Sequence, residues 1–239
     1  MVIPCFNEAN TLRHCFQRVN EARLPDGWGR EITIVDDHSS SETETIARDI
    51  VAGNEQARLI RHDRNRGKGA AVRTGFSDAL GRAGDDDAIV VQDADLEYDP
   101  NDIAPMLKAL EGDGIDAVYG DRFDRGRRVS PLGRLHTLVN RSLTHLSNLA
   151  TGLRVHDMEC CYKCIRAPLA KRILPELSED RFGIEPQVTA ALARAGAHIT
   201  NLPVSYQARG FDEGKKIGAR DGMRAVTVIL KEWFRRGPR

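Results

Sequence analysis

The sequence has few aromatic residues, no long apolar run and no excess of charge of either sign. Phe, Trp and Tyr make up 5% of the 239 residues, and the formal net charge is +0 at pH 7. A neutral chain has no bulk attraction for nucleic acid. No run approaches the roughly 18 consecutive apolar residues of a membrane span, and no signal peptide is visible. The sequence therefore predicts neither a membrane-spanning protein nor a nucleic-acid-binding protein.

Cysteine is also scarce and odd in number. Five cysteines occur, three of them in the segment Cys160-Cys-Tyr-Lys-Cys164, and no second pair of ligands stands at zinc-site spacing. An odd count without an export signal indicates a reducing compartment, where thiols stay free. We expect a cytoplasmic protein, and peripheral contact with the cytoplasmic face of a membrane stays open.

Length and hydrophobic content suit one large α/β domain. Short apolar segments alternate with helical patterns in the first half, which predicts right-handed βαβ units and a mainly parallel sheet flanked by helices. The strand candidates are residues 2–4, 31–35, 58–61, 88–92, 116–119 and 198–206, and the helical candidates are residues 8–22, 41–52, 69–80, 102–110, 135–149, 186–195 and 221–234. The last helix has an apolar face, which suits packing on the same domain or on a dimer partner. That face contains Met223, Val226, Leu230 and Trp233.

The apolar segment Ala88–Gln92 breaks abruptly into an acidic turn. Asp93, Asp95 and Glu97 follow it at the carboxyl end of a predicted buried strand, where open α/β sheets keep their ligand crevices. Two carboxylates one residue apart, with a third two residues further on, can converge on a hard divalent cation such as Mg²⁺ or Mn²⁺. Such a motif standing alone is better explained as a solvated acidic turn. A cation site is favoured only if the neighbouring strands also end in polar residues.

Three other predicted strands end in polar residues at the same edge of the sheet. Glu8 follows the first strand, Asp37 the second and Arg122 the fifth. In a parallel sheet these ends face one crevice, so their side chains can meet the acidic turn over one ligand. A crevice that holds a divalent cation suits a diphosphate.

Two basic segments provide candidate contacts for the phosphate charge. Arg209, Lys215 and Lys216 lie in a glycine-bearing segment after the last strand, which can fold over an anion, although a solvated linker is an equal alternative. Residues 65–69 place glycine beside Lys68, but without the spacing of a phosphate loop. We expect a tight turn there, which seats the following helix and leaves Lys68 near the ligand.

Five motifs in their order along the chain resemble glycosyltransferase family 2. They are Ile3-Pro-Cys-Phe-Asn-Glu8, Ile34-Val-Asp-Asp-His-Ser39, Asn65-Arg-Gly-Lys-Gly69, Asp93-Ala-Asp-Leu-Glu97 and Gly120-Asp-Arg122. This resemblance, which runs essentially from end to end, implies an inverting nucleotide-sugar enzyme with the GT-A fold, a Rossmann-like sheet flanked by helices. Residues 157–163 and 209–215 are similar to the polyprenyl-phosphate glycosyltransferases, the group of dolichyl-phosphate mannose synthase. The C-terminal membrane-spanning helices of some relatives are missing, which implies a soluble or peripheral form.

The resemblance assigns roles residue by residue. It implies nucleotide-sugar binding by Pro4, Phe6, Glu8, Val35, Asp37, Lys68, Asp93, Ala94, Arg209 and Lys215. It implies a divalent metal, Mg²⁺ or Mn²⁺, on Asp93, Asp95 and Glu97, where the subgroup often has glutamine at the third position. It implies catalytic roles for Asp95, Arg122 and Asp157, with Arg122 near the transferred sugar and the acceptor phosphate. The charge of the arginines in residues 125–128 suits the same acceptor phosphate.

The predicted reaction is inverting, metal-dependent transfer of a hexose from a UDP- or GDP-hexose to a polyprenyl phosphate of the dolichyl or undecaprenyl type. A lipid phosphate is already ionised at neutral pH and needs orientation and charge neutralisation rather than a base. One alternative is a saccharide or other hydroxyl acceptor, with Asp157 as general base. Another is a non-catalytic nucleotide-sugar-binding protein. We expect a single catalytic domain over residues 1–239, with the nucleotide sugar in residues 1–120 and the acceptor in residues 121–239, and a homodimer stays open.

Overall fold

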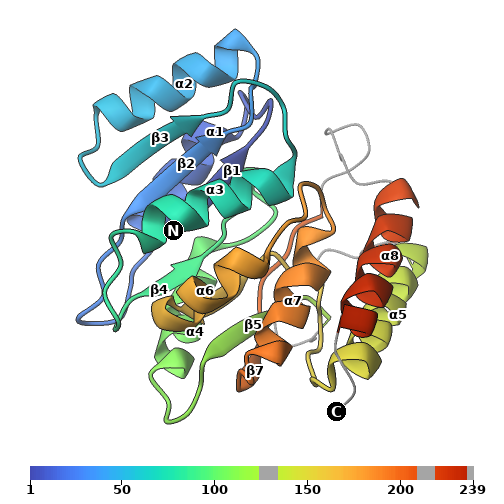
Figure 1. Ribbon diagram of the computed structural model, residues 1–239. Coiled ribbons are helices and arrows are strands. Elements are labelled where there is room, and N and C mark those ends of the chain that lie inside the picture. Colours follow the sequence, from blue (N-terminus) through green and yellow to red (C-terminus); the bar gives the residue numbers. More distant parts are fainter. Residues whose placement is uncertain (124–133, 209–218, 236–239) are drawn as a thin grey trace.

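The computed structural model of the protein describes residues 1–123, 134–208 and 219–235. Strands and helices alternate through the first half, as the sequence predicts (Figure 1). The elements are β1 (Val2–Cys5), α1 (Leu12–Glu21), β2 (Ile32–Asp36), α2 (Ser41–Ala52), β3 (Ala57–Arg61), α3 (Lys68–Leu80), β4 (Ala88–Val90), η1 (Pro100–Asp102), α4 (Ile103–Leu110), β5 (Ala117–Asp121), α5 (Arg134–Thr151), β6 (Lys163–Arg166), α6 (Ala167–Ile173), η2 (Leu174–Glu176), α7 (Ile184–Arg194), β7 (Ile199–Pro203) and α8 (Ala219–Arg235).

The strands form two sheets that meet edge to edge. The first has the order β1-β2-β3 with parallel neighbours, and the second has the order β4-β6-β5-β7. A parallel bridge between Val2 and Val91 joins the two. β5 and β7 are parallel, whereas β6 runs antiparallel to both β4 and β5. The predicted α/β fold with a mainly parallel sheet is confirmed, and β6 is its antiparallel member.

Neither β6 nor the helix α6 that follows it was expected from the sequence. β6 has 4 residues, and both its first and its last residue, Lys163 and Arg166, are basic. Such a short segment carries no apolar alternation from which to predict a strand. β6 forms because β4 and β5 offer it hydrogen-bonding edges on both sides.

A glycine allows α3 to lie close against the sheet. A Cβ added to Gly75 would lie 2.2 Å from Cγ1 of Val2 in β1, so a larger residue would push the helix outward. α3 packs on β1 and β2 (Figure 1). Since α3 follows the carboxyl end of β3, its first residue, Lys68, lies at the sheet edge where the predicted site residues stand.

The last helix, α8, packs through a different face from the predicted one. It lies beside α5 and α7 (Figure 1) and buries Ala225, Val228 and Ile229. Met223 and Trp233, on the predicted packing face, are 65% and 43% exposed. Of the predicted face, Val226 packs partly against the core, whereas Met223, Leu230 and Trp233 stay exposed because the neighbouring helices α5 and α7 contact a different face. Packing of the exposed residues on a dimer partner stays a prediction. None of the helices in the described ranges combines the length and apolar character that crossing a membrane requires.

Candidate functional site

The polar strand ends surround one cavity of about 360 Å³. It is lined by most of the residues predicted for the site, namely Pro4, Phe6, Glu8, Asp37, Lys68, Asp93, Ala94, Asp95, Glu97 and Arg122. Val35 does not reach it, because this side chain is buried in the hydrophobic core. Arg209 and Lys215, and the arginines of residues 125–128, lie outside the described residues.

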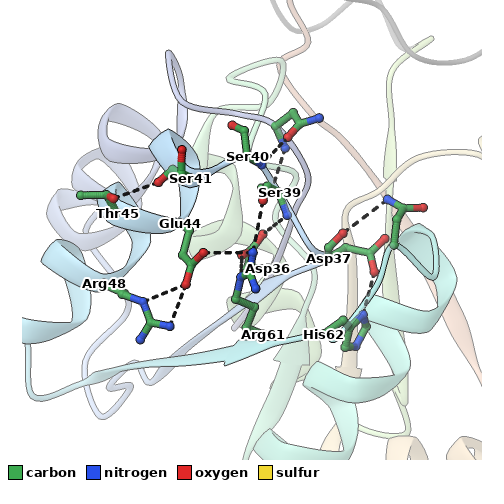
Figure 2. A network of polar contacts seen from close by, with 12 residues as sticks. Asp36, Asp37, Ser39, Ser40, Ser41, Glu44, Thr45, Arg48, Arg61 and His62 are labelled. Atoms are coloured by element: carbon green, nitrogen blue, oxygen red, sulfur yellow. Dashed lines mark hydrogen bonds and ion pairs between the residues drawn. The ribbon is translucent and has the colours of Figure 1, made fainter.

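Asp37 organises the turn that leads into α3. Its Oδ1 accepts a hydrogen bond from the backbone N–H of Arg66 at 2.8 Å, and its Oδ2 accepts one from the N–H of Gly67 at 2.7 Å. Nδ1 of His62 lies 2.6 Å from Oδ1, and Figure 2 shows this pair beside the neighbouring contacts of Asp36 with Arg61. Asp37 therefore connects β2 to the predicted tight turn and places Lys68 at the cavity.

The three carboxylates of the acidic turn have different partners. Asp93 forms an ion pair with Lys68, whose Nζ lies 2.8 Å from Oδ1 of Asp93. Oδ1 of Asp95 accepts a hydrogen bond from the backbone N–H of Glu97 at 3.1 Å, and Oε2 of Glu97 accepts one from the hydroxyl of Tyr206 at 2.7 Å. Across the part of the chain that the structure describes, no three His, Cys, Asp or Glu side chains are gathered as a metal-binding group. The predicted three-carboxylate metal set is thus not brought together by the protein alone.

A chain of alternating charges leads away from Asp93 along the cavity. Nζ of Lys68 lies 3.5 Å from Oε1 of Glu185, and Oε2 of Glu185 pairs with the buried Lys163. Burial opposes the charge of Lys68, but the carboxylates, Asp93 first among them, raise the pKa of this lysine well above its ordinary value. Lys68 is therefore a cation at neutral pH, and it already neutralises Asp93.

Arg122 and Asp157 form a buried bidentate ion pair. Nε and Nη2 of Arg122 donate to the two carboxylate oxygens of Asp157 at 2.6 Å and 2.9 Å. The Asp157 side chain is 0% exposed, whereas Arg122 lines the cavity with its guanidinium 5.1 Å from the centre of the Tyr206 ring. Asp157 therefore orients Arg122 and compensates its charge, and this fully buried carboxylate does not itself line the cavity.

The cavity also contains residues that the sequence analysis did not select. They are His136, Asn140, Glu159, Glu185 and Tyr206, among others. Glu159 stands inside the segment 157–163 that resembles relatives, so its position there was a usable signal. The rest come from α5, α7 and the segment after β7, which reach the cavity through tertiary packing.

Known proteins resemble this chain both in sequence and in fold. The sequence model of Glycosyl transferase family 2 matches residues 1–174. Dodecaprenyl-phosphate galacturonate synthase from Rhizobium johnstonii is 32% identical over 98% of this chain, and dolichol-phosphate mannosyltransferase from Pyrococcus furiosus is 25% identical over 91%. The chain spans 66% and 59% of these two relatives, which is less than two thirds of their length. Undecaprenyl-phosphate mannosyltransferase from Micrococcus luteus is 25% identical over 95% of this chain and 90% of that protein.

A solved structure has the same architecture. Glucosyl-3-phosphoglycerate synthase from Mycobacterium tuberculosis, in complex with Mn²⁺, UDP and phosphoglyceric acid, superposes with a TM-score of 0.69 at 22% identity. The match covers 98% of this chain and 77% of that one. This likeness shows the GT-A fold that the sequence predicts.

Proposed function

Because the chain belongs to glycosyl transferase family 2 and is a glycosyltransferase, we propose that it transfers a hexosyl group from a nucleoside diphosphate sugar to a polyprenyl phosphate, with inversion. Three relatives are named for transfer of a sugar to dodecaprenyl, dolichol or undecaprenyl phosphate. The observation that carries the proposal is one cavity lined by both the acidic turn and Arg122. The acidic turn suits a donor diphosphate with a cation, and a guanidinium suits an acceptor phosphate.

A divalent cation, Mg²⁺ or Mn²⁺, fits the acidic turn together with the donor. Asp93 and Asp95 both line the cavity and offer the oxygen ligands that hard cations prefer, with Glu97 as a further contact. Mg²⁺ is commonly bound by one or two carboxylates plus substrate phosphates, so a preformed group of three carboxylates is not needed. When bound, the cation supplies Lewis-acid stabilisation of the charge on the departing diphosphate. Lys68, Arg209 and Lys215 are proposed to contact the same diphosphate.

The Arg122–Asp157 pair supports a phosphate as the acceptor. An ionised phosphate needs a fixed cation and no proton removal, and Arg122 is held at the cavity by both oxygens of Asp157. A hydroxyl acceptor would need a base, and Asp157 is fully buried and does not line the cavity. We propose that Asp157 positions Arg122, and that residues 1–239 act as one catalytic domain with the nucleotide on residues 1–120, where Glu8 and Asp37 contribute contacts.

An acceptor matrix tests this function. UDP- and GDP-hexoses are incubated with a short polyprenyl phosphate, with 3-phosphoglycerate or with simple saccharides, each with Mg²⁺, with Mn²⁺ or with a chelator. We expect product with the polyprenyl phosphate and a metal, and the opposite anomeric configuration from the donor by NMR. Product restricted to saccharides or to 3-phosphoglycerate would contradict the lipid-phosphate acceptor. Full activity in the chelator would contradict the role of the metal.

A further inference from the structure

One carboxyl group of the cavity has an oxygen without a partner. Glu159 lines the cavity, and its Oε1 is buried with no hydrogen-bond donor in reach among the residues that the structure describes. Other carboxylates of the same cavity have cations at contact distance: Lys68 binds Asp93, and Lys163 binds Glu185. Glu159 therefore differs from its neighbours in what the protein provides for it.

This arrangement is unfavourable for the protein by itself. A buried polar oxygen without a hydrogen bond costs free energy, and more so when the group is ionised. Burial first, and then the nearby carboxylate of Glu185, raise the pKa of Glu159 to about 7. A carboxyl group in such surroundings is accounted for when a ligand supplies the missing donor.

The charges around Glu159 favour a ligand that offers hydroxyl groups. Glu159 interacts electrostatically with the cations Lys163 and Arg122, and each of these is already paired with a carboxylate, Glu185 and Asp157 respectively. An anionic ligand group at Glu159 would be repelled by this carboxylate, because the nearby cations are already paired with other carboxylates. A sugar is uncharged at its ring and carries several hydroxyl donors, and carboxylate oxygens accept strong hydrogen bonds from them.

We propose that Glu159 binds a hydroxyl group of the transferred sugar and thereby contributes to the choice of donor. The inference rests on the proposed function, in which the sugar lies between the diphosphate at the acidic turn and the acceptor phosphate at Arg122. Glu159 lines the same cavity as Asp93 and Arg122 and interacts with the charges of Arg122 and Glu185. Glu159 therefore belongs to the cavity in which the proposed function places the transferred sugar.

The test separates binding of the sugar from binding of the nucleotide. A panel of UDP- and GDP-hexoses, with UDP and GDP, is titrated by calorimetry in Mg²⁺ against the wild type, Glu159→Ala, Glu159→Gln and Glu55→Ala. Glu55 is an exposed glutamate in the turn between α2 and β3 and serves as the matched control. For the best nucleotide sugar we expect Glu159→Ala to weaken binding about 10- to 100-fold, the range for a hydrogen bond to a charged group. Its affinity for the matching nucleoside diphosphate is expected to change less than about twofold.

The outcomes distinguish the inference from the proposed function. Unchanged sugar affinity in Glu159→Ala, or an equal loss for sugar and nucleotide, overturns the inference. Wild type that binds no member of the panel overturns the proposed function instead, whatever Glu159 does. Glu159→Gln keeps the side-chain shape and provides the answer should the alanine variant fail to fold. It is expected to lose sugar affinity several-fold, because a neutral acceptor oxygen replaces a charged one, and affinity equal to the wild type in this variant also overturns the inference.

Discussion

Replacing Glu159 with glutamine is expected to stabilise the protein, by an amount that grows with pH. Burial and the Glu185 carboxylate raise the pKa of Glu159 from 4.5 to about 7 in the folded protein. In the unfolded chain the same group ionises near its ordinary value. Between these two values the folded protein binds more protons than the unfolded chain, so the free energy of unfolding falls as the pH rises. The destabilisation caused by the ionised Glu159 is absent below the pKa of the unfolded chain and complete above the pKa of the folded protein.

The size of the effect follows from the same two values. The difference between 4.5 and about 7 corresponds to at most about 3 kcal/mol, at about 1.36 kcal/mol per pH unit. Glu159 is half-buried and borders an open cavity, so screening by solvent reduces the expected gain to about 1–2 kcal/mol at pH 8. For a chain of this length that gain raises Tm by about 2–8 °C.

Urea unfolding followed by circular dichroism at pH 5, 6, 7 and 8 measures this gain. The quantity compared is the free energy of unfolding of Glu159→Gln minus that of the wild type, because other titrating groups cancel in the difference. Glu55→Gln removes a carboxylate from an exposed position and serves as the control. A constant difference for Glu159→Gln, or a variant less stable than the wild type at pH 8, would refute the reasoning. Stabilisation together with weaker sugar binding is the combination expected of a residue kept for its ligand.

Four further substitutions test the remaining contacts of the site. Asp93→Ala or Asp95→Ala is expected to lower metal-dependent transfer at least about 100-fold, and near-normal turnover in either variant would argue against the acidic turn as the diphosphate site. Asp157→Asn leaves the guanidinium of Arg122 buried without a counter-charge, so the free energy of unfolding is expected to fall by about 3–5 kcal/mol; an unchanged urea midpoint would show that the ion pair is dispensable. Lys68→Met removes the cation that neutralises Asp93, with which a metal ion has to compete. In the absence of nucleotide, Mn²⁺ is therefore expected to bind the variant more tightly than the wild type, as measured by electron paramagnetic resonance. Equal affinities would contradict competition between Lys68 and the metal for Asp93.

Much of the first half of the fold was predictable because its patterns are local. The apolar segments and the helical patterns between them identify β1 to β5 and α1 to α4, with shifts of a few residues at most ends. Since the carboxyl ends of parallel strands meet at one edge, the polar residues after them were expected to meet as well. Glu8, Asp37, Asp95 and Arg122 do line one cavity. The strand β6 was missed because its four residues show no strand pattern, and it forms only by pairing with β4 and β5.

The partners of the charged side chains were less predictable. Asp157 was considered as a base for a hydroxyl acceptor, and the structure pairs both its oxygens with Arg122. Lys68 was expected near the ligand, and it also lies against Asp93 and Glu185. Such pairs join residues from distant parts of the chain, so their distances depend on how β5, α3 and α7 pack.

The sequence by itself determined the order of strands and helices, the polar ends of the strands and the motifs of the family. These features are local, and the rule that parallel strands align their ends turns them into a site at one edge of the sheet. Only the tertiary structure decided which charges neutralise one another, which face of α8 is buried and that Glu159 has an oxygen without a partner among the described residues. Electrostatic pairing and desolvation depend on separations of a few ångströms between groups far apart in the chain, and no pattern along the sequence contains those separations.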